Sequence, residues 1–182
     1  MDRKRTLGLA ALFILAVGTV SLGKSGAEFG VFGTYLDSKD FGDGFGGGLK
    51  LEMNPINWLA VDARVSYVRF DDLGNARVKV DMVPIEITGL LNLPLADERI
   101  VPYAGVGVGY YFIDPDKGSL DNNVGFFPLL GLEIGDPSCS LMVEARWLFL
   151  QSDVDRAEAE FQHLSKAKVD SIGINLGLIA RF

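Results

Sequence analysis

The sequence SIGINLGLIARF (Ser171–Phe182) alternates between apolar residues and small or polar ones. Ile179 breaks the rule, and the alternating apolar residues are Ile172, Ile174, Leu176, Leu178, Ala180 and Phe182. A period of two is the pattern of a β-strand whose two faces lie in different surroundings. Chain ends usually fray, so an alternation that continues to a final aromatic residue indicates a strand that the fold requires.

Seven further segments with this period precede it, and each is bounded by residues that favour turns. They are Glu28–Leu36, Gly47–Met53, Trp58–Phe70, Arg77–Leu93, Val101–Phe112, Gly125–Gly135 and Ser140–Leu150, and the eighth is Lys168–Phe182. Within the fourth segment the alternation changes phase near Val83 and Pro84. A phase change at a proline predicts a β-bulge there.

The connections between these segments alternate in character. Short turns are predicted at Asn54–Asn57, Pro94–Arg99 and Gly135–Ser138. Longer or more polar loops are predicted at Asp37–Gly46, Asp71–Ala76, Asp114–Asn123 and Gln151–Ala167. Short and long connections at opposite ends are typical of an up-and-down antiparallel sheet, in which the last strand can close on the first.

One face of the segments is almost entirely apolar, whereas the other mixes glycine with charges of both signs. A soluble barrel turns its apolar face inward, and a transmembrane barrel turns that face toward lipid. Aromatic residues gather toward the segment ends, as in the interfacial belts of membrane proteins: Trp58, Tyr67, Phe70, Tyr103, Tyr110, Phe112, Trp147 and Phe149. Because lipid cannot satisfy an open sheet edge, the predicted fold is an all-β, eight-stranded antiparallel up-and-down transmembrane β-barrel.

Charged residues fall on the face that this fold turns inward. They are Lys50, Glu52, Asp62, Arg64, Glu86, Glu133, Glu144, Arg146 and Arg181. Buried charges are tolerated when they are paired, and an eight-stranded barrel is just wide enough for side chains to fill it. The sequence therefore predicts a salt-bridged interior without a wide pore. A narrow ion path gated by rearranging pairs stays open as an alternative.

The chain resembles the small eight-stranded outer-membrane β-barrel families of Gram-negative bacteria, such as the OmpA transmembrane domain and OmpX-like proteins. The resemblance covers residues 28–182 and rests on the strand count, the loop asymmetry, PYAGVGVGYYF (Pro102–Phe112) and the final INLGLIARF. It implies a monomer in the outer membrane, among lipid and lipopolysaccharide. It also implies that the barrel assembly machinery reads Phe182 together with Ile174, Leu176, Leu178 and Ala180. The sequence shows no peptidoglycan-binding domain of the OmpA type after the barrel.

The first 27 residues are predicted to be a signal peptide for Sec-type export, which leaves residues 28–182 as the barrel domain. A basic start, MDRKR, precedes an apolar run, and the small residues Ser25 and Ala27 mark a cleavage site after Ala27. An uncleaved membrane anchor is the alternative. Cleavage removes four of 17 basic and one of 24 acidic residues, so the net charge becomes −10. A protein with this negative net charge is not expected to bind nucleic acid.

Few residues of the sequence are candidates for catalysis or metal binding. The one histidine, His163, lies near Glu158, Glu160 and Ser165 in a polar loop, which leaves a lipid A-modifying enzyme as an alternative without a supporting motif. No metal site or cofactor is expected, since one histidine and one cysteine, Cys139, offer no ligand cluster. A soluble lipocalin-like binder is a further alternative that would turn the apolar face inward. The favoured function is a non-enzymatic scaffold whose long, acidic loops meet partners outside the cell.

Overall fold

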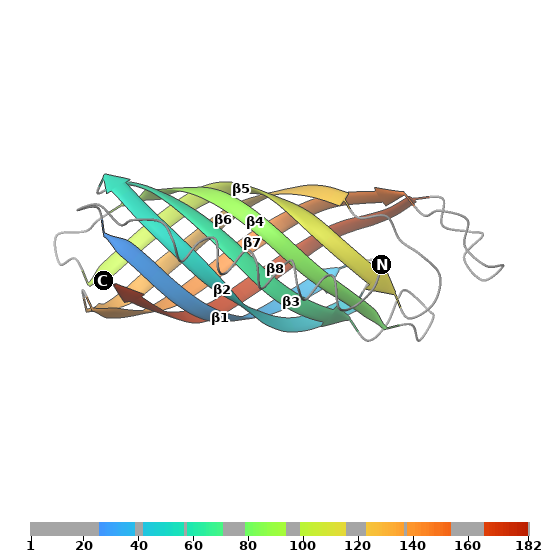
Figure 1. Cartoon of the computed structure of the whole chain (residues 1–182), viewed down its shortest axis with the longest axis horizontal. Coiled ribbons are helices and arrows are strands. Elements are labelled where there is room, and N and C mark those ends of the chain that lie inside the picture. The colour runs from blue at the N-terminus through green and yellow to red at the C-terminus, as the bar shows by residue number, and fades with distance from the viewer. Residues whose placement is uncertain are drawn as a thin grey trace.

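Eight β-strands make up almost all of the described chain, which comprises residues 26–38, 42–56, 58–70, 79–93, 99–115, 123–136, 138–153 and 166–181 of a computed structural model. The strands are β1 (Ala27–Ser38), β2 (Gly42–Ile56), β3 (Leu59–Phe70), β4 (Val80–Asn92), β5 (Ile100–Pro115), β6 (Asn123–Asp136), β7 (Cys139–Asp153) and β8 (Lys166–Arg181). Each strand pairs antiparallel with the next, and the sheet closes into a barrel (Figure 1). The predicted fold class is confirmed. Among these residues, no helix is long and apolar enough to cross a membrane.

The ladder between β1 and β8 closes the barrel. It runs without a break from the pair Glu28–Arg181 to the pair Ser38–Ser171. Because β8 also pairs with β7 along its whole length, neither the first strand nor the last leaves a free edge. The alternating segment at the end of the sequence is therefore the closing strand, as predicted. Phe182 lies outside the described residues.

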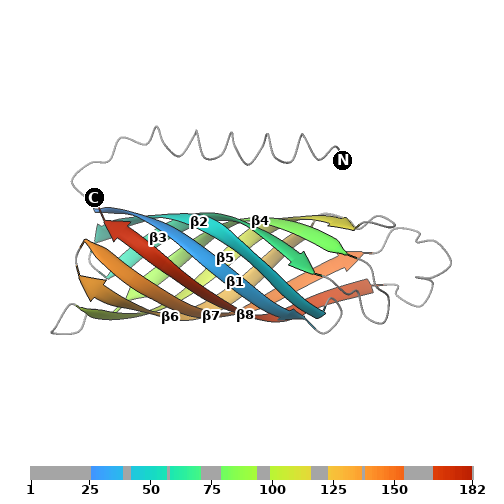
Figure 2. The ribbon, with the colours of Figure 1, turned by 90° about the horizontal axis from the view of Figure 1, so that it is seen from below.

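The two ends of the barrel differ in the length of sequence that connects the strands, and Figure 2 shows that β1 begins and β8 ends at the same end. The end where β1 begins and β8 ends carries the short turns between β2 and β3 and between β6 and β7, and we call it the terminal end. At the opposite end, the loop end, residues 39–41, 71–79, 116–122 and 154–165 connect the strands.

The long first loop predicted at Asp37–Gly46 is wrong. β1 continues to Ser38 and β2 begins at Gly42, so only residues 39–41 separate the two strands. Gly42 has a φ of 66°, a left-handed conformation that glycine adopts without steric cost. The polar and glycine-rich sequence that suggested a loop therefore forms the barrel wall.

The bulge predicted at Val83 and Pro84 is also wrong. β4 alternates without interruption, and its register with β5 is continuous from Val80 to Asn92. Val80 and Met82 point into the barrel although they are apolar, because the interior near the loop end is itself apolar. What changes at Pro84 is the chemistry of the interior and not the phase of the strand.

The outer wall of the barrel is apolar. Trp58, Tyr67, Tyr110, Trp147 and Phe149 of the predicted aromatic belt are exposed, and Phe112 is half-buried. Phe70 and Tyr103 were assigned to the same belt wrongly, since they are only 1% and 3% exposed and point inward. Both residues are in phase with the inward-facing charges or glycines of their own strands.

Glycines of the barrel wall differ in how closely a neighbouring strand approaches them. A Cβ atom at Gly46 would collide with the backbone of Tyr67 and Val68 on β3, whereas a Cβ atom at Gly89 would meet nothing within 4 Å. Adding a methyl group should therefore destabilise the barrel more at Gly46 than at Gly89.

We expect Gly46→Ala to lower the free energy of unfolding by about 1–3 kcal/mol or more, because overpacking displaces the neighbouring strand. Gly89→Ala is the matched control and should leave stability within about 0.5 kcal/mol. Urea unfolding of protein refolded into lipid vesicles measures both. Equal effects for the two variants would contradict the packing at Gly46.

Candidate functional site

The charged residues that the sequence predicts inside the barrel lie in its interior. The structure turns all nine charged residues inward and buries all of them except Arg181, which is half-buried at the terminal end. Arg64 is 1% exposed and Arg146 0%, so the surrounding side chains shield both guanidiniums from solvent. We call these nine residues, together with Glu28, the charged layer.

Arg64 on β3 stands at the centre of the charged layer. Its guanidinium donates to Asp62, two residues along the same strand, with Nε 3.1 Å from Oδ1. It also reaches across to Glu144 on β7, with Nη1 2.7 Å from Oε1. Glu144 accepts two further hydrogen bonds, from the Tyr103 hydroxyl at 3.2 Å and from the Asn175 amide at 2.7 Å. One carboxylate thus links β3, β5, β7 and β8 across the interior.

A second ion pair joins β4 and β7. Nη1 of Arg146 lies 3.0 Å and 2.9 Å from the two carboxylate oxygens of Glu86. The Tyr111 hydroxyl donates to the same carboxylate at 2.7 Å. The Arg146 guanidinium lies over the ring of Phe127 at 5.7 Å from its centre, which favours the charge through a cation–π interaction. This contact matters because Nε and Nη2 of Arg146 have no hydrogen-bond partner in the described part of the chain.

The remaining charges gather at the terminal end. Nζ of Lys50 lies 2.8 Å from Glu52 and 3.6 Å from Asp62. Arg181 on the last strand donates to Glu28 on the first strand at 2.8 Å and also to Glu133 on β6. This arginine therefore adds an ionic contact to the ladder that closes the barrel.

Three carboxylates at the terminal end have a spacing that a divalent cation could use. Oxygen atoms of Glu28, Glu52 and Glu133 lie within 4.8 Å of one another. Arg181 already donates to Glu28 and Glu133, and Lys50 pairs with Glu52. Two protein cations thus pair with the three carboxylates, in the way that buried carboxylates require, and one negative charge is left in excess.

Four polar residues of the interior were missed by the sequence reading. Glu28, Tyr103, Tyr111 and Asn175 all take part in the hydrogen bonds described above. Each lies an even number of residues from an inward-facing glycine or charge on its own strand. The phase of the alternation was the signal that could have found them. His163, Ser165, Glu158 and Glu160 of the enzyme alternative lie outside the described residues.

Comparisons with known proteins agree on the fold. No protein family model and no curated protein sequence matches the chain. Among solved structures, the chain is similar to neisserial surface protein A, with 16% identity, a TM-score of 0.62, and 88% of this chain and 98% of that one covered.

It is also similar to the outer membrane protein OprG from Pseudomonas aeruginosa, with 14% identity, a TM-score of 0.61, and coverage of 87% and 95%. The N-terminal β-barrel domain of Pseudomonas aeruginosa OprF matches with 13% identity, a TM-score of 0.51, and coverage of 88% and 100%. Identities this low show a shared fold, which is that of the small outer-membrane β-barrels.

Two arginines on β3 allow the interior and the exterior to be compared on one strand. We expect Arg64→Met to lower the free energy of unfolding by about 3–5 kcal/mol, because it leaves the buried carboxylates Asp62 and Glu144 without their main partner. Arg69→Met is the matched control. Arg69 is 45% exposed and pairs with Asp81 at 2.8 Å on the outer wall, so its loss should cost less than about 1 kcal/mol.

Urea unfolding in lipid vesicles measures both arginine variants. A second measurement tests the pairing itself, since Arg64→Met combined with Glu144→Leu removes one of the two carboxylates that lose their partner and should recover part of the lost stability. If Arg64→Met were as mild as Arg69→Met, the interior would be hydrated and the ion pairs would not be holding it together.

Proposed function

We propose that this chain is an integral outer-membrane β-barrel protein of Gram-negative bacteria and that it is a non-enzymatic scaffold for surface-exposed loops. The observation that carries the proposal is the inversion of the usual protein pattern, with an apolar outer wall around a charged interior. The proposal draws further support from the resemblance of the fold to outer-membrane barrels.

The outer wall is suited to lipid. Val106 and Val108 in the middle of β5, and Leu176 and Leu178 toward the end of β8, are each 55–57% exposed. In water, so many exposed apolar side chains would be unfavourable by about 25 cal/mol for each Å², and soluble monomers rarely expose apolar patches beyond a few hundred Å². The soluble lipocalin-like alternative requires the opposite orientation of the two faces, so the structure contradicts it.

The interior supports a scaffold rather than a wide pore. The guanidiniums of Arg64 and Arg146 and the Tyr111 ring are at most 1% exposed, although they lie in the middle of the lumen. An open channel would leave such polar groups in contact with water. Filling of this kind makes the wall rigid, which suits a protein that presents loops at one end.

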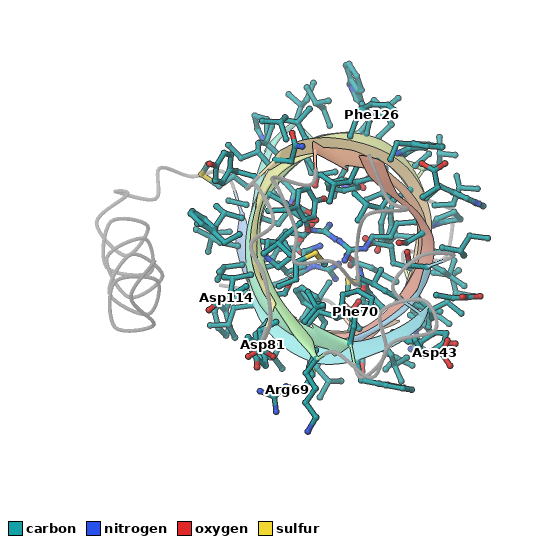
Figure 3. All side chains as sticks on the ribbon, turned by 90° about the vertical axis from the view of Figure 1, so that its right-hand side faces the viewer. Asp43, Arg69, Phe70, Asp81, Asp114 and Phe126 are labelled. Atoms are coloured by element: carbon teal, nitrogen blue, oxygen red, sulfur yellow. The ribbon has the colours of Figure 1, made fainter. Side chains whose placement is uncertain are left out.

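The loop end supports a partner that is cationic or bridged by divalent cations, such as lipopolysaccharide. Residues 39–41, 71–79, 116–122 and 154–165 together contain eight acidic and five basic residues. On the strands below them, Asp37 lies opposite Asp43, and Asp81 lies opposite Asp114. Figure 3, seen from the loop end, shows Asp43, Asp81 and Asp114 on the outside of the barrel. Directly opposed like charges destabilise a sheet unless a cation lies near them. Arg69 supplies that cation to Asp81 at 2.8 Å, so the pair that an external cation would bridge is Asp37 and Asp43.

The lipid-facing wall can be tested by the depth dependence of an inserted charge. We expect Val108→Arg, in the middle of β5, to lower stability by about 2–4 kcal/mol, and Ile100→Arg, at the start of the same strand, by about 0–1 kcal/mol. Unfolding of the two variants from lipid vesicles measures the difference. Equal, small effects would mean that the wall faces water and would overturn the membrane location.

The assembly signal implied by the family resemblance gives a separate prediction. Ile174, Leu176 and Leu178 point outward and are 50–56% exposed, Ala180 is half-buried, and Phe182 follows as the last aromatic. We expect Phe182→Ala to reduce the fraction of protein assembled in the outer membrane of living cells. Assembly is measured by the gel mobility of unheated against boiled membranes. Refolding of purified protein into vesicles should be unchanged, and an equal loss there would assign Phe182 to stability.

A further inference from the structure

As far as the structure describes it, the interior near the loop end carries no charge and is largely apolar, with the buried hydroxyls of Ser38 and Ser171 as polar groups at this level. Large apolar side chains from five strands point inward there, and we call them the apolar collar: Leu36, Val68, Phe70, Val80, Met82, Ile113, Leu148 and Leu150. All are 0–2% exposed except Ile113, which is 6% exposed. They belong to one continuous cluster of buried residues.

The collar lies between the charged layer and the loops. On β3 the inward positions run from Arg64 through Ser66 to Val68 and Phe70, which ends the strand at the loop end. On β7 the order is the same, with Leu148 and Leu150 following Arg146 toward the loops. Among the side chains that the structure describes, no charged one points inward beyond this level. Figure 3 shows Phe70 directed into the barrel at this end while its neighbour Arg69 points out.

Glycines on the three other strands are the counterpart of the collar. A Cβ atom at Gly44 on β2 would lie 2.5 Å from the Phe70 ring, and one at Gly173 on β8 would lie 2.5 Å from Leu36. On β6, a Cβ atom at Gly125 would lie 3.2 Å from Leu148 and 3.3 Å from Leu150. The bulky residues of one strand thus lie flat against the bare backbone of the strand beside it, and their 0–2% exposure shows that water does not reach them.

We propose that the apolar collar is the barrier that prevents water and ions from crossing the barrel, and that it acts independently of the ion pairs. An ion can pass an ion-paired layer when the pairs exchange partners, because charged groups replace its hydration shell. It finds no such groups in the collar, and hydrophobic constrictions exclude water and ions together. This inference rests on the proposed function, since only a barrel in a membrane separates two compartments.

Conductance in planar lipid bilayers tests the collar against the charged layer. The charged layer is opened with Glu86→Ala plus Arg146→Ala, which removes both members of one pair and leaves no lone charge. The collar is opened with Phe70→Ser plus Leu148→Ser, and a fourth protein carries all four changes. The gel mobility shift between unheated and boiled samples establishes that each variant forms a closed barrel before it is recorded.

We expect no current steps from the wild type or from the charged-layer variant, and resolvable steps from the protein that carries all four changes. Current through the charged-layer variant alone would overturn the collar as an independent barrier. Silence of the fourfold variant would overturn it as well, because the rest of the charged layer would then close the barrel without the collar. A conducting wild type would instead contradict the filled interior of the proposed function, so the two failures are distinguishable.

A second measurement does not require the fourfold variant to fold. Ser66 lies between the collar and Arg64, is 5% exposed, and has a hydroxyl with no hydrogen-bond partner among the described residues, so Ser66→Cys fits the site. The substitution is placed in a Cys139→Ser background, because Cys139 is exposed.

A small charged thiol reagent, added from the loop end, should leave the thiol introduced by Ser66→Cys unmodified behind an intact collar. Modification should become complete when Phe70→Gly is added, because the one aromatic ring of the collar is then missing. It should stay absent with the control Phe70→Leu, which keeps an apolar side chain at the same place. Modification behind the intact collar would overturn the proposal.

Discussion

Closure of the sheet is the constraint on which the rest of the structure depends. Every backbone N–H and C=O group that lies in lipid must find a partner within the protein, because an unpaired group there costs several kcal/mol. Each strand pairs with the next one along the chain, which leaves one edge of β1 and one edge of β8 open. The β1–β8 ladder pairs these two edges with each other. It brings residues 153 positions apart, Glu28 and Arg181, into direct contact. Closure in turn produces a narrow interior that side chains must fill.

Two different chemistries fill that interior. The charged layer is stable because each buried charge has a partner on a different strand or two residues along its own, as with Arg64 between Asp62 and Glu144. The apolar collar is stable because its side chains are packed against glycines, as with Phe70 and Gly44. Both arrangements exclude water, but the first can exchange partners and the second cannot. The barrel is thus divided along its axis into a part near the termini that holds the charges, together with buried apolar residues such as Met142 and Ile179, and a largely apolar part near the loops.

The alternation of residues was sufficient to predict the strands and the inward direction of the charges. Charged side chains such as Lys50 and Glu144 could be assigned because a charge has one favourable face in a membrane barrel, the one away from lipid. Apolar residues were harder to assign, because either face can accept them. Phe70 and Tyr103 were therefore placed in the aromatic belt although their phase pointed inward. The apparent bulge at Pro84 arose in the same way, from the assumption that an inward face must be polar.

The sequence by itself determined the period of two, the strand count and the sign of the two faces, because these follow from local residue types and the geometry of an extended chain. Tertiary structure alone decided which carboxylate pairs with which cation, since those partners come from strands far apart in the sequence, such as Glu86 and Arg146. It also decided that the glycine-rich segment from Gly42 to Gly48 is wall rather than loop. That segment is held in the wall by its ladders with β1 and β3, and no local pattern records those neighbours.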